Sequence, residues 1–281
     1  HEGSGYNPPV PPRSSLRARR EHARRVLDAL ERAHPEARCA LEYRSAFQLA
    51  VATVLSAQCT DLRVNQVTPA LFARYPDAAA LAEAKAEDVE EIIRSTGFFR
   101  AKTRSLLGLA RGLVERHGGE IPREMSTLVK LPGIGRKTAN VVLGHAFDVN
   151  EGIAVDTHVL RLANRIGLVD VDDPAKVEAL LMELIPRERW TRTTDLIIFH
   201  GRKVCDARRP ACGTCPIFTL CGWESRQAWA ASEPPAPTRR ARTTREGTSR
   251  RPASRSKRSP ARGGRETTTD RRPRGDSGEG K

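Results

Sequence analysis

Hydrophobic positions recur with the period of an α-helix through most of this chain. Residues 100–119, RAKTRSLLGLARGLVERHGG, carry apolar side chains at helical spacing and end at a pair of glycines. Residues 44–58, RSAFQLAVATVLSAQ, are apolar on most faces, which is typical of a helix buried in the middle of a domain. The alternation expected of strands is absent. The pattern therefore predicts an all-α body from about Leu16 to His200.

Local signals mark the ends of several predicted helices and of the body itself. Residues 86–97 begin with acidic side chains and stop at Gly97, and residues 173–186 begin with Asp173 as N-cap and a proline in the first turn. Residues 1–15 are rich in Pro, Ser and Gly, and residues 230–281 have almost no apolar side chains. Because such segments bury too little surface to offset their ordering entropy, we expect both to be disordered.

Charge points to a polyanionic partner. The 281 residues have a formal net charge of +14, which is typical of a protein that binds nucleic acid. From Thr238 to Lys281 there are 15 Lys/Arg and 5 Asp/Glu, so +10 of this charge lies in the tail. Charge alone therefore fits a basic tail as well as a DNA enzyme. We find no membrane span of about 18 apolar residues and no secretion signal, and we expect a cytoplasmic protein.

A glycine turn separates two predicted helices at residues 131–135, LPGIG. Gly133 and Gly135 permit positive φ angles and a close approach of the backbone to another surface. Backbone N–H groups of such a turn, with the N-terminus of the next helix, form an anion site that suits a DNA phosphate. The alternative is a plain helix–turn–helix corner whose glycines serve only the turn.

Two charged residues are candidates for chemistry. Lys137 lies in the first turn after the glycines, where the helix dipole disfavours an ammonium and favours the nucleophilic free amine. The alternatives are a second phosphate contact or a solvated lysine. Asp156 lies between an apolar run and a helix, where it is expected as an N-cap. It is also a candidate carboxylate facing Lys137 that would stabilise positive charge on a sugar.

Four of the six cysteines crowd into a short segment, with the spacing C-x6-C-x2-C-x5-C. These are Cys205, Cys212, Cys215 and Cys221. Four thiolates ligate a [4Fe–4S] cluster or a tetrahedral zinc, and the single short pair favours the cluster modestly. A disulfide is the least favoured alternative. Cys39 and Cys59 lie outside this spacing and are expected in the core.

These motifs together resemble one family. The segments LPGIGRKTANVV and VDTHVLR are similar to the endonuclease III family of helix-hairpin-helix DNA glycosylases, and the likeness runs from about Leu16 to Trp223. The resemblance implies that Lys137 attacks C1′ of a damaged nucleotide with the assistance of Asp156. It also implies that the four clustered cysteines hold a [4Fe–4S] cluster.

The resemblance further implies residues that contact DNA. Gln58, in SAQ, and Phe98, after a glycine, would fill the space left by a nucleotide rotated out of the duplex. The alternatives are that Gln58 is only a polar helix end and that Phe98 is a core aromatic. The neighbouring Phe99 could exchange roles with Phe98. Relatives often have a smaller aliphatic wedge. Arg208 and Arg209 lie in the cysteine segment and are expected either on phosphates or in a solvated loop.

By resemblance, the fold has two lobes with a cleft between them. A helical barrel would span residues 39–150, and an iron–sulfur lobe would combine residues 16–38 with 151–224. The implied function is a bifunctional DNA glycosylase and abasic-site (AP) lyase. It would remove oxidised pyrimidines from double-stranded DNA and cleave the strand by β-elimination. We expect a monomer associated with the nucleoid, with the tail adding salt-sensitive DNA affinity.

Two alternatives remain open at this point. The first is an adenine-specific relative, which normally lacks a lysine at position 137 and carries a further C-terminal domain in place of a basic tail. The second is a non-catalytic DNA-binding protein that uses the hairpin and the cluster for structure or redox sensing.

Overall fold

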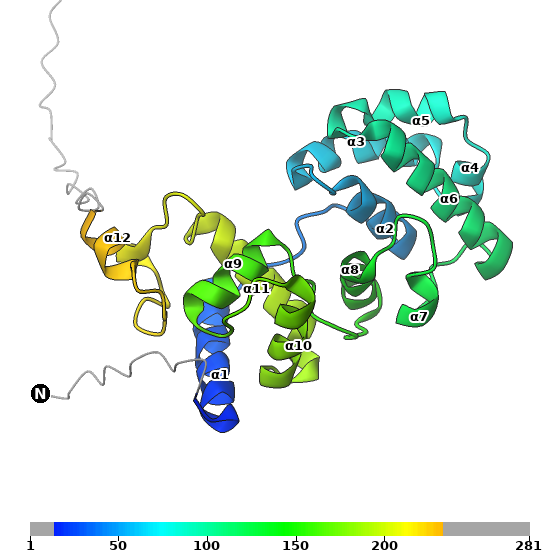
Figure 1. Cartoon of the computed structure of the whole chain (residues 1–281). Coiled ribbons are helices and arrows are strands. Elements are labelled where there is room, and N and C mark those ends of the chain that lie inside the picture. Colours follow the sequence, from blue (N-terminus) through cyan, green and yellow to red (C-terminus); the bar gives the residue numbers. More distant parts are fainter. Residues whose placement is uncertain (1–13, 233–281) are drawn as a thin grey trace, which may run out of the picture. The chain divides into compact units, whose positions relative to one another are not determined.

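The structure, a computed structural model, describes residues 14–232 (Figure 1), and within them it contains helices and no strand. The all-α prediction is confirmed. The longer helices are α1 (Leu16–Ala33), α2 (Ala46–Leu55), α3 (Asp61–Arg74), α5 (Ala86–Ile93), α6 (Phe99–His117), α8 (Arg136–Phe147), α9 (Thr157–Ile166), α10 (Pro174–Leu184) and α11 (Trp190–Lys203). Short helical segments are α4 (Ala78–Ala82), η1 (Arg94–Thr96), α7 (Met125–Leu128), η2 (Arg187–Arg189), η3 (Cys212–Thr214) and α12 (Arg226–Ser232).

The predicted ends need small corrections. Ser15, expected in a disordered segment, is the N-cap of α1, because its hydroxyl accepts a hydrogen bond from Ala18 N. Residues 230–232, expected in the tail, are the last residues of α12. The remainder of both segments, residues 1–13 and 233–281, lies outside the described residues. Asp173 is confirmed as an N-cap, since its carboxylate accepts from Lys176 N at 2.8 Å.

The buried apolar side chains form two separate clusters. The first runs from Leu41 to Leu143 and is built by helices α2 to α8. The second joins residues 23–37 of α1 and its following turn with residues 153–217, mainly from α9, α10 and α11. Figure 1 shows α1 packed beside α10 and α11. The described residues belong to one compact unit, and the division into lobes at residues 39–150 stays a proposal.

Helix α8 belongs to the first cluster and is attached to helices of the second by two polar contacts. Near its start, Glu178 of α10 accepts hydrogen bonds from Arg136 Nε at 2.8 Å and Asn140 Nδ2 at 2.9 Å. Near its end, His145 Nε2 lies 3.0 Å from Asp195 Oδ1 of α11. These contacts orient α8, which carries Lys137, relative to α10 and α11.

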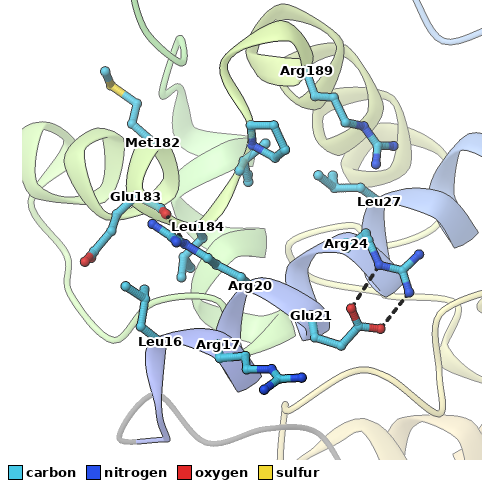
Figure 2. A pocket seen from close by; sticks show the side chains of 12 residues that line it. Leu16, Arg17, Arg20, Glu21, Arg24, Leu27, Met182, Glu183, Leu184 and Arg189 are labelled. Atoms are coloured by element: carbon cyan, nitrogen blue, oxygen red, sulfur yellow. Dashed lines mark hydrogen bonds and ion pairs between the residues drawn. The ribbon is translucent and has the colours of Figure 1, made fainter.

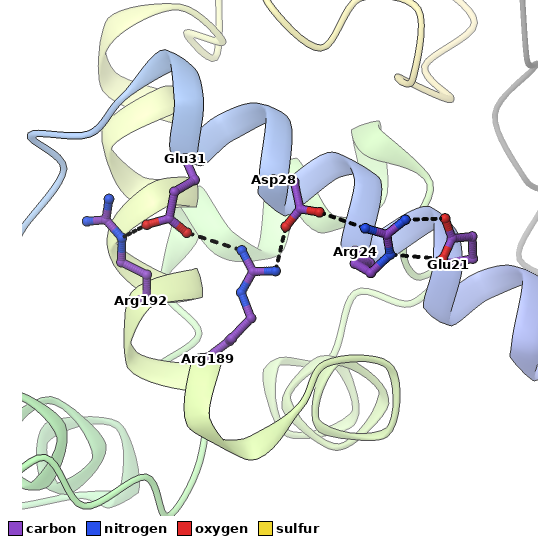
Figure 3. Close-up of polar contacts among 6 residues, drawn as sticks. All are labelled: Glu21, Arg24, Asp28, Glu31, Arg189 and Arg192. Carbon is purple, nitrogen blue, oxygen red and sulfur yellow. Dashed lines mark hydrogen bonds and ion pairs between the residues drawn. The ribbon is translucent and has the colours of Figure 1, made fainter.

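An ion-pair network attaches α1 to the start of α11 (Figure 3). Arg189 pairs with Asp28 at 2.7 Å and with Glu31 at 3.1 Å, and Arg192 pairs with Glu31 at 2.8 Å. Arg192 also donates to the carbonyl of Ala37, at the turn that follows α1. Since these side chains are partly solvated, each pair contributes on the order of 1 kcal/mol or less, and the network mainly determines how α1 is seated.

Candidate active site

One pocket of about 390 Å³ brings together three of the predicted site residues. Gln58, Lys137 and Asp156 all line it, although they are far apart in the sequence. Its walls come from the C-terminal end of α2, the start of α8, the segment before α9 and one face of α11. A larger hollow of about 880 Å³ lies between α1 and the end of α10 and contains none of these residues (Figure 2). Residue chemistry, rather than size, therefore identifies the candidate site.

The glycine hairpin leads from α7 into α8. Gly133 has a φ of 78°, and a Cβ there would lie 2.8 Å from Ser105 Cβ, so both its conformation and its surroundings favour glycine. Gly135 does not use the conformational freedom of glycine, because its φ of −89° is one that any residue adopts. A Cβ at Gly135 would meet nothing within 4 Å, so the backbone there faces open space.

The hairpin leaves donors free for an anion. Among residues 14–232, the backbone N–H groups of Gly133, Gly135 and Arg136 have no hydrogen-bond partner. The first N–H groups of any helix lack intrahelical acceptors and carry partial positive charge. Free N–H groups at the start of α8 are therefore available to bind an anion such as phosphate.

Lys137 is the second residue of α8 and is exposed to solvent. Its ammonium group makes no hydrogen bond or ion pair with the rest of residues 14–232. The amine is therefore unpaired at the pocket that the side chain lines.

Asp156 is confirmed as the N-cap of α9. Its Oδ1 accepts hydrogen bonds from His158 N and Val159 N, both at 2.8 Å, which fixes the carboxylate at the end of the helix. Oδ2 has no hydrogen-bond partner within the described part of the chain. The two carboxylate oxygens thus differ, one serving the cap and one remaining available at the pocket. No ion pair within 4 Å joins Asp156 to Lys137.

Gln58 and Phe98 share an unusual backbone conformation. Their φ angles are 51° and 49°, in the left-handed region, which costs an L-residue about 1–2 kcal/mol. Gln58 lies exposed just after α2. Phe98 precedes α6 and is 67% exposed, whereas Phe99 is half-buried against the first cluster. Phe98, which does not line the pocket, is thus the more exposed of the two phenyl rings.

A buried lysine supports the turn that presents Phe98. Lys102 of α6 is only 5% exposed, and its ammonium donates to Thr96 O at 2.8 Å. Burial lowers the pKa of Lys102. The contact ties the end of η1 to the first turns of α6, on either side of the strained residue.

The four clustered cysteines line a second, smaller pocket. None of the four forms a disulfide within the described residues, and burial raises the pKa of Cys215 to about 12. His200 Nε2 lies 3.6 Å from Cys215 Sγ, and Arg165 Nη1 donates to Cys205 Sγ at 3.5 Å. Within residues 14–232, no group of three or more His, Cys, Asp or Glu side chains is arranged to hold a single metal ion.

The donor set fits an iron–sulfur cluster. Four thiols around one apolar pocket are the ligands that a [4Fe–4S] cluster uses. Cys39 and Cys59 pack against the first cluster of buried apolar side chains, as expected of core residues. Both also line the pocket of Lys137.

Arg208 and Arg209 lie on an exposed loop between the first two clustered cysteines. Their backbone N–H groups donate to Asp206 Oδ1 at 2.8 and 2.9 Å, which shapes the loop. Neither guanidinium has a partner within the described residues, and neither residue lines the pocket of Lys137.

Sequence reasoning missed the polar residues that α11 and α10 contribute. Asp195 and Arg202 of α11 line the pocket, and Arg202 pairs with Asp61 of α3 at 2.6 Å across it. Glu178 of α10 accepts hydrogen bonds from Arg136 and Asn140 of α8. Because these residues lie on amphipathic helices with no local motif, only their tertiary partners distinguish them from ordinary surface charges.

Comparisons with known proteins agree on one family. Residues 51–187 match the model described as "HhH-GPD superfamily base excision DNA repair protein". The chain is 51% identical over 206 residues to endonuclease III of Synechocystis sp., covering 73% of this chain and 94% of the relative. It is 38% identical to endonuclease III of Escherichia coli, covering 72% of this chain and 95% of the relative.

Solved structures give the same result. A structure of a trapped endonuclease III–DNA covalent intermediate superposes with a TM-score of 0.70 at 43% identity, covering 74% of this chain and 97% of that chain. A thermostable thymine-DNA glycosylase, at 21% identity and a TM-score of 0.64, has a similar fold.

Proposed function

Because this chain belongs to the endonuclease III family of base excision repair DNA glycosylases, we propose that it is bifunctional and also cleaves the DNA strand as an AP lyase. The single observation that carries the proposal is that Lys137 and Asp156 line one pocket, with the Lys137 amine free of any partner within residues 14–232.

The reaction begins at Lys137. The lone pair of its Nζ attacks C1′ of the extruded nucleotide, and the glycosidic bond breaks with its electron pair on the departing base. The sugar ring opens as the amine forms a Schiff base at C1′. This cationic group makes the C2′ proton acidic, so that its removal expels the 3′ phosphate by β-elimination. Water then hydrolyses the Schiff base and restores the amine.

Asp156 provides the negative charge that the first step needs. Positive charge develops on the sugar as the base leaves, and a fixed carboxylate nearby stabilises it. Since its Oδ1 is held by two backbone N–H groups, the carboxylate does not have to reorganise during the reaction. Oδ2 remains available to accept a proton or a hydrogen bond.

Binding to double-stranded DNA uses groups outside the reacting pair. The free N–H groups at Gly133 and Gly135 hold a phosphate without reading sequence. Gln58 and Phe98 occupy the space that the extruded nucleotide leaves, and their strained turns support this because they expose both side chains. Arg208 and Arg209 add phosphate contacts from the cysteine loop.

Cys205, Cys212, Cys215 and Cys221 are the residues that would hold a [4Fe–4S] cluster. When bound, such a cluster braces the loop and offers one-electron redox chemistry, and no step of base removal requires it. The residues around the pocket contribute hydrogen bonds to the thiolates, with Arg165 directed at Cys205 and His200 at Cys215.

Further features of this proposal concern the substrate and setting. We propose oxidised pyrimidines as the excised bases, a monomeric enzyme and association with the nucleoid. Within residues 14–232, no helix is long and apolar enough to cross a membrane.

Borohydride trapping tests the lyase. Reduction during reaction with abasic-site DNA converts the Schiff base into a stable covalent complex, which we expect for the wild type and not for Lys137→Ala. The matched control is Lys176→Ala, because Lys176 is also an exposed lysine in the first turn of a helix, with Asp173 as N-cap. DNA binding without trapping by the wild type would contradict the proposal and favour the non-catalytic alternative.

A further inference from the structure

Asp195 places a carboxylate in the wall of the pocket that Lys137 and Asp156 also line. It lies on α11, and its side chain is 13% exposed. No Arg or Lys within residues 14–232 pairs with it, and its partner is His145 Nε2, at 3.0 and 3.2 Å from the two oxygens. Because a carboxylate repels phosphate, its partner in a bound nucleotide must be a hydrogen-bond donor.

His145 keeps Asp195 in the role of an acceptor. The ring Nδ1 lies 3.0 Å from Val141 O, while Nε2 faces the carboxylate, so both ring nitrogens must donate and the ring carries a positive charge. Burial lowers the pKa of His145, but the hydrogen bond and charge of Asp195 outweigh it, and the pKa is raised overall. One N–H shared by two oxygens leaves unused lone pairs on both.

Neighbouring hydroxyls in the same pocket also present acceptors. The hydroxyls of Thr53, Ser56 and Thr194 each donate to a backbone carbonyl, at 2.7, 2.8 and 3.4 Å respectively. A hydroxyl has one proton, so after this donation only its oxygen lone pairs remain for a ligand. These acceptors on α11 and at the end of α2 match a ligand edge that donates hydrogen bonds, while Arg202 of α11, which lines the same pocket, is paired with Asp61.

We propose that Asp195 is a specificity-determining residue of the glycosylase, accepting a hydrogen bond from an N–H group on the edge of the extruded base. The inference rests on the proposed function, because only a base rotated out of the duplex reaches this pocket. A ring imide N–H or an exocyclic amino group supplies the donor. A base with a methyl group at that position offers no donor to the remaining lone pairs of Asp195, which keeps only its contact with His145, and this lowers the rate of excision by about 10- to 100-fold.

Three duplexes that differ at one nucleotide test the inference with the full chain. The first contains thymine glycol, an oxidised pyrimidine with a ring N3–H, the second contains its N3-methyl derivative, and the third contains an abasic site. Single-turnover rates of strand cleavage are measured on denaturing gels. We expect the wild type to excise the N3–H base about 10- to 100-fold faster than the N3-methyl base. This comparison needs no variant, so it does not depend on whether one folds.

Asp195→Asn separates hydrogen bonding from the bulk of the methyl group, because we expect its single amide oxygen to accept from His145 Nε2–H and its NH2 group, a donor, to face the base. We expect the preference for the N3–H base to fall at least fivefold, and excision to fall relative to abasic-site cleavage by the same variant. Glu188→Gln, which neutralises an exposed carboxylate on η2, is the matched control and should keep the wild-type preference.

Two results would overturn the inference. Equal wild-type rates on the two bases would show that the pocket does not detect the donor. If Asp195→Asn retained the preference for the N3–H base, the preference would be due to the bulk of the methyl group instead. Failure of the wild type to cleave or trap abasic-site DNA is a distinct result, because it would overturn the proposed lyase activity.

Discussion

Glu178 should control both the stability of the fold and the position of Lys137. Its carboxylate accepts from Arg136 Nε and Asn140 Nδ2, the residues on either side of Lys137 along α8. Arg136 is 52% exposed, so water replaces its lost partner and the ion pair itself contributes about 1 kcal/mol or less. Asn140 is 5% exposed, so an unpaired Nδ2 costs about 1–3 kcal/mol.

The two contacts are separated by two variants. Glu178→Gln keeps an oxygen for Asn140 and should lower the free energy of unfolding by about 1 kcal/mol, as should Arg136→Ala. Glu178→Leu removes both acceptors and should lower it by about 3 kcal/mol, because Asn140 Oδ1 already lacks a partner within residues 14–232. Urea unfolding monitored by circular dichroism measures these differences.

Activity adds an independent measurement. A helix start displaced by about 1 Å is enough to lower a rate up to 100-fold, so Glu178→Leu should slow borohydride trapping by at least tenfold under conditions where it remains folded. Equal losses of unfolding free energy in Glu178→Gln and Glu178→Leu would refute the assignment of the larger loss to an unpaired Asn140 side chain. Normal trapping by a clearly destabilised Leu variant would refute the positioning of Lys137 by this contact.

Three further predictions concern other contacts of α8 and the cysteine loop. In Gly144→Ala, the new Cβ would overlap Thr191 Oγ1 and lie 2.9 Å from its Cγ2, so we expect a loss of about 1–3 kcal/mol in urea unfolding that Thr191→Ala partly restores. Because Asp195 raises the pKa of His145, this pair stabilises the fold fully below the unfolded pKa of about 6.5 and loses its effect as pH rises through the folded pKa. The stability difference between the wild type and His145→Gln should therefore shrink as the pH rises from about 6.5 through the raised folded pKa, and a constant difference would contradict the charged pair. Cys212→Ser should reduce the iron and labile sulfide bound per chain, whereas Cys39→Ser should not, and zinc in place of iron in the purified protein would refute the cluster.

Local sequence signals were sufficient for the features that depend on a few neighbouring residues. The N-cap at Asp156, the N-cap at Asp173 and the turn at Gly133 follow from side-chain chemistry and backbone sterics within one helical turn. The sequence did not show whether Gly133 or Gly135 uses the positive φ that glycine permits, and in the structure only Gly133 does so.

The way the helices pack against one another could not be predicted from the sequence alone. Whether Lys137 and Asp156 share a pocket depends on how α8 packs against α10 and α11, which is decided by contacts such as Glu178 with Asn140 and Asp195 with His145. Helical periodicity indicates which face of each helix is buried. The same buried face can pack against many different helices and at many crossing angles, so periodicity does not determine the packing.

The amino-acid sequence by itself determined that the described body is helical and where several of its helices begin and end, and it indicated Lys137 and Asp156 as candidates for the chemistry. Only the tertiary structure decided that an amine, a capping carboxylate and the acceptor wall of α11 meet in one pocket. The physical reason is that helix formation follows from interactions within four residues along the chain, whereas a pocket depends on close packing between residues separated by dozens of positions.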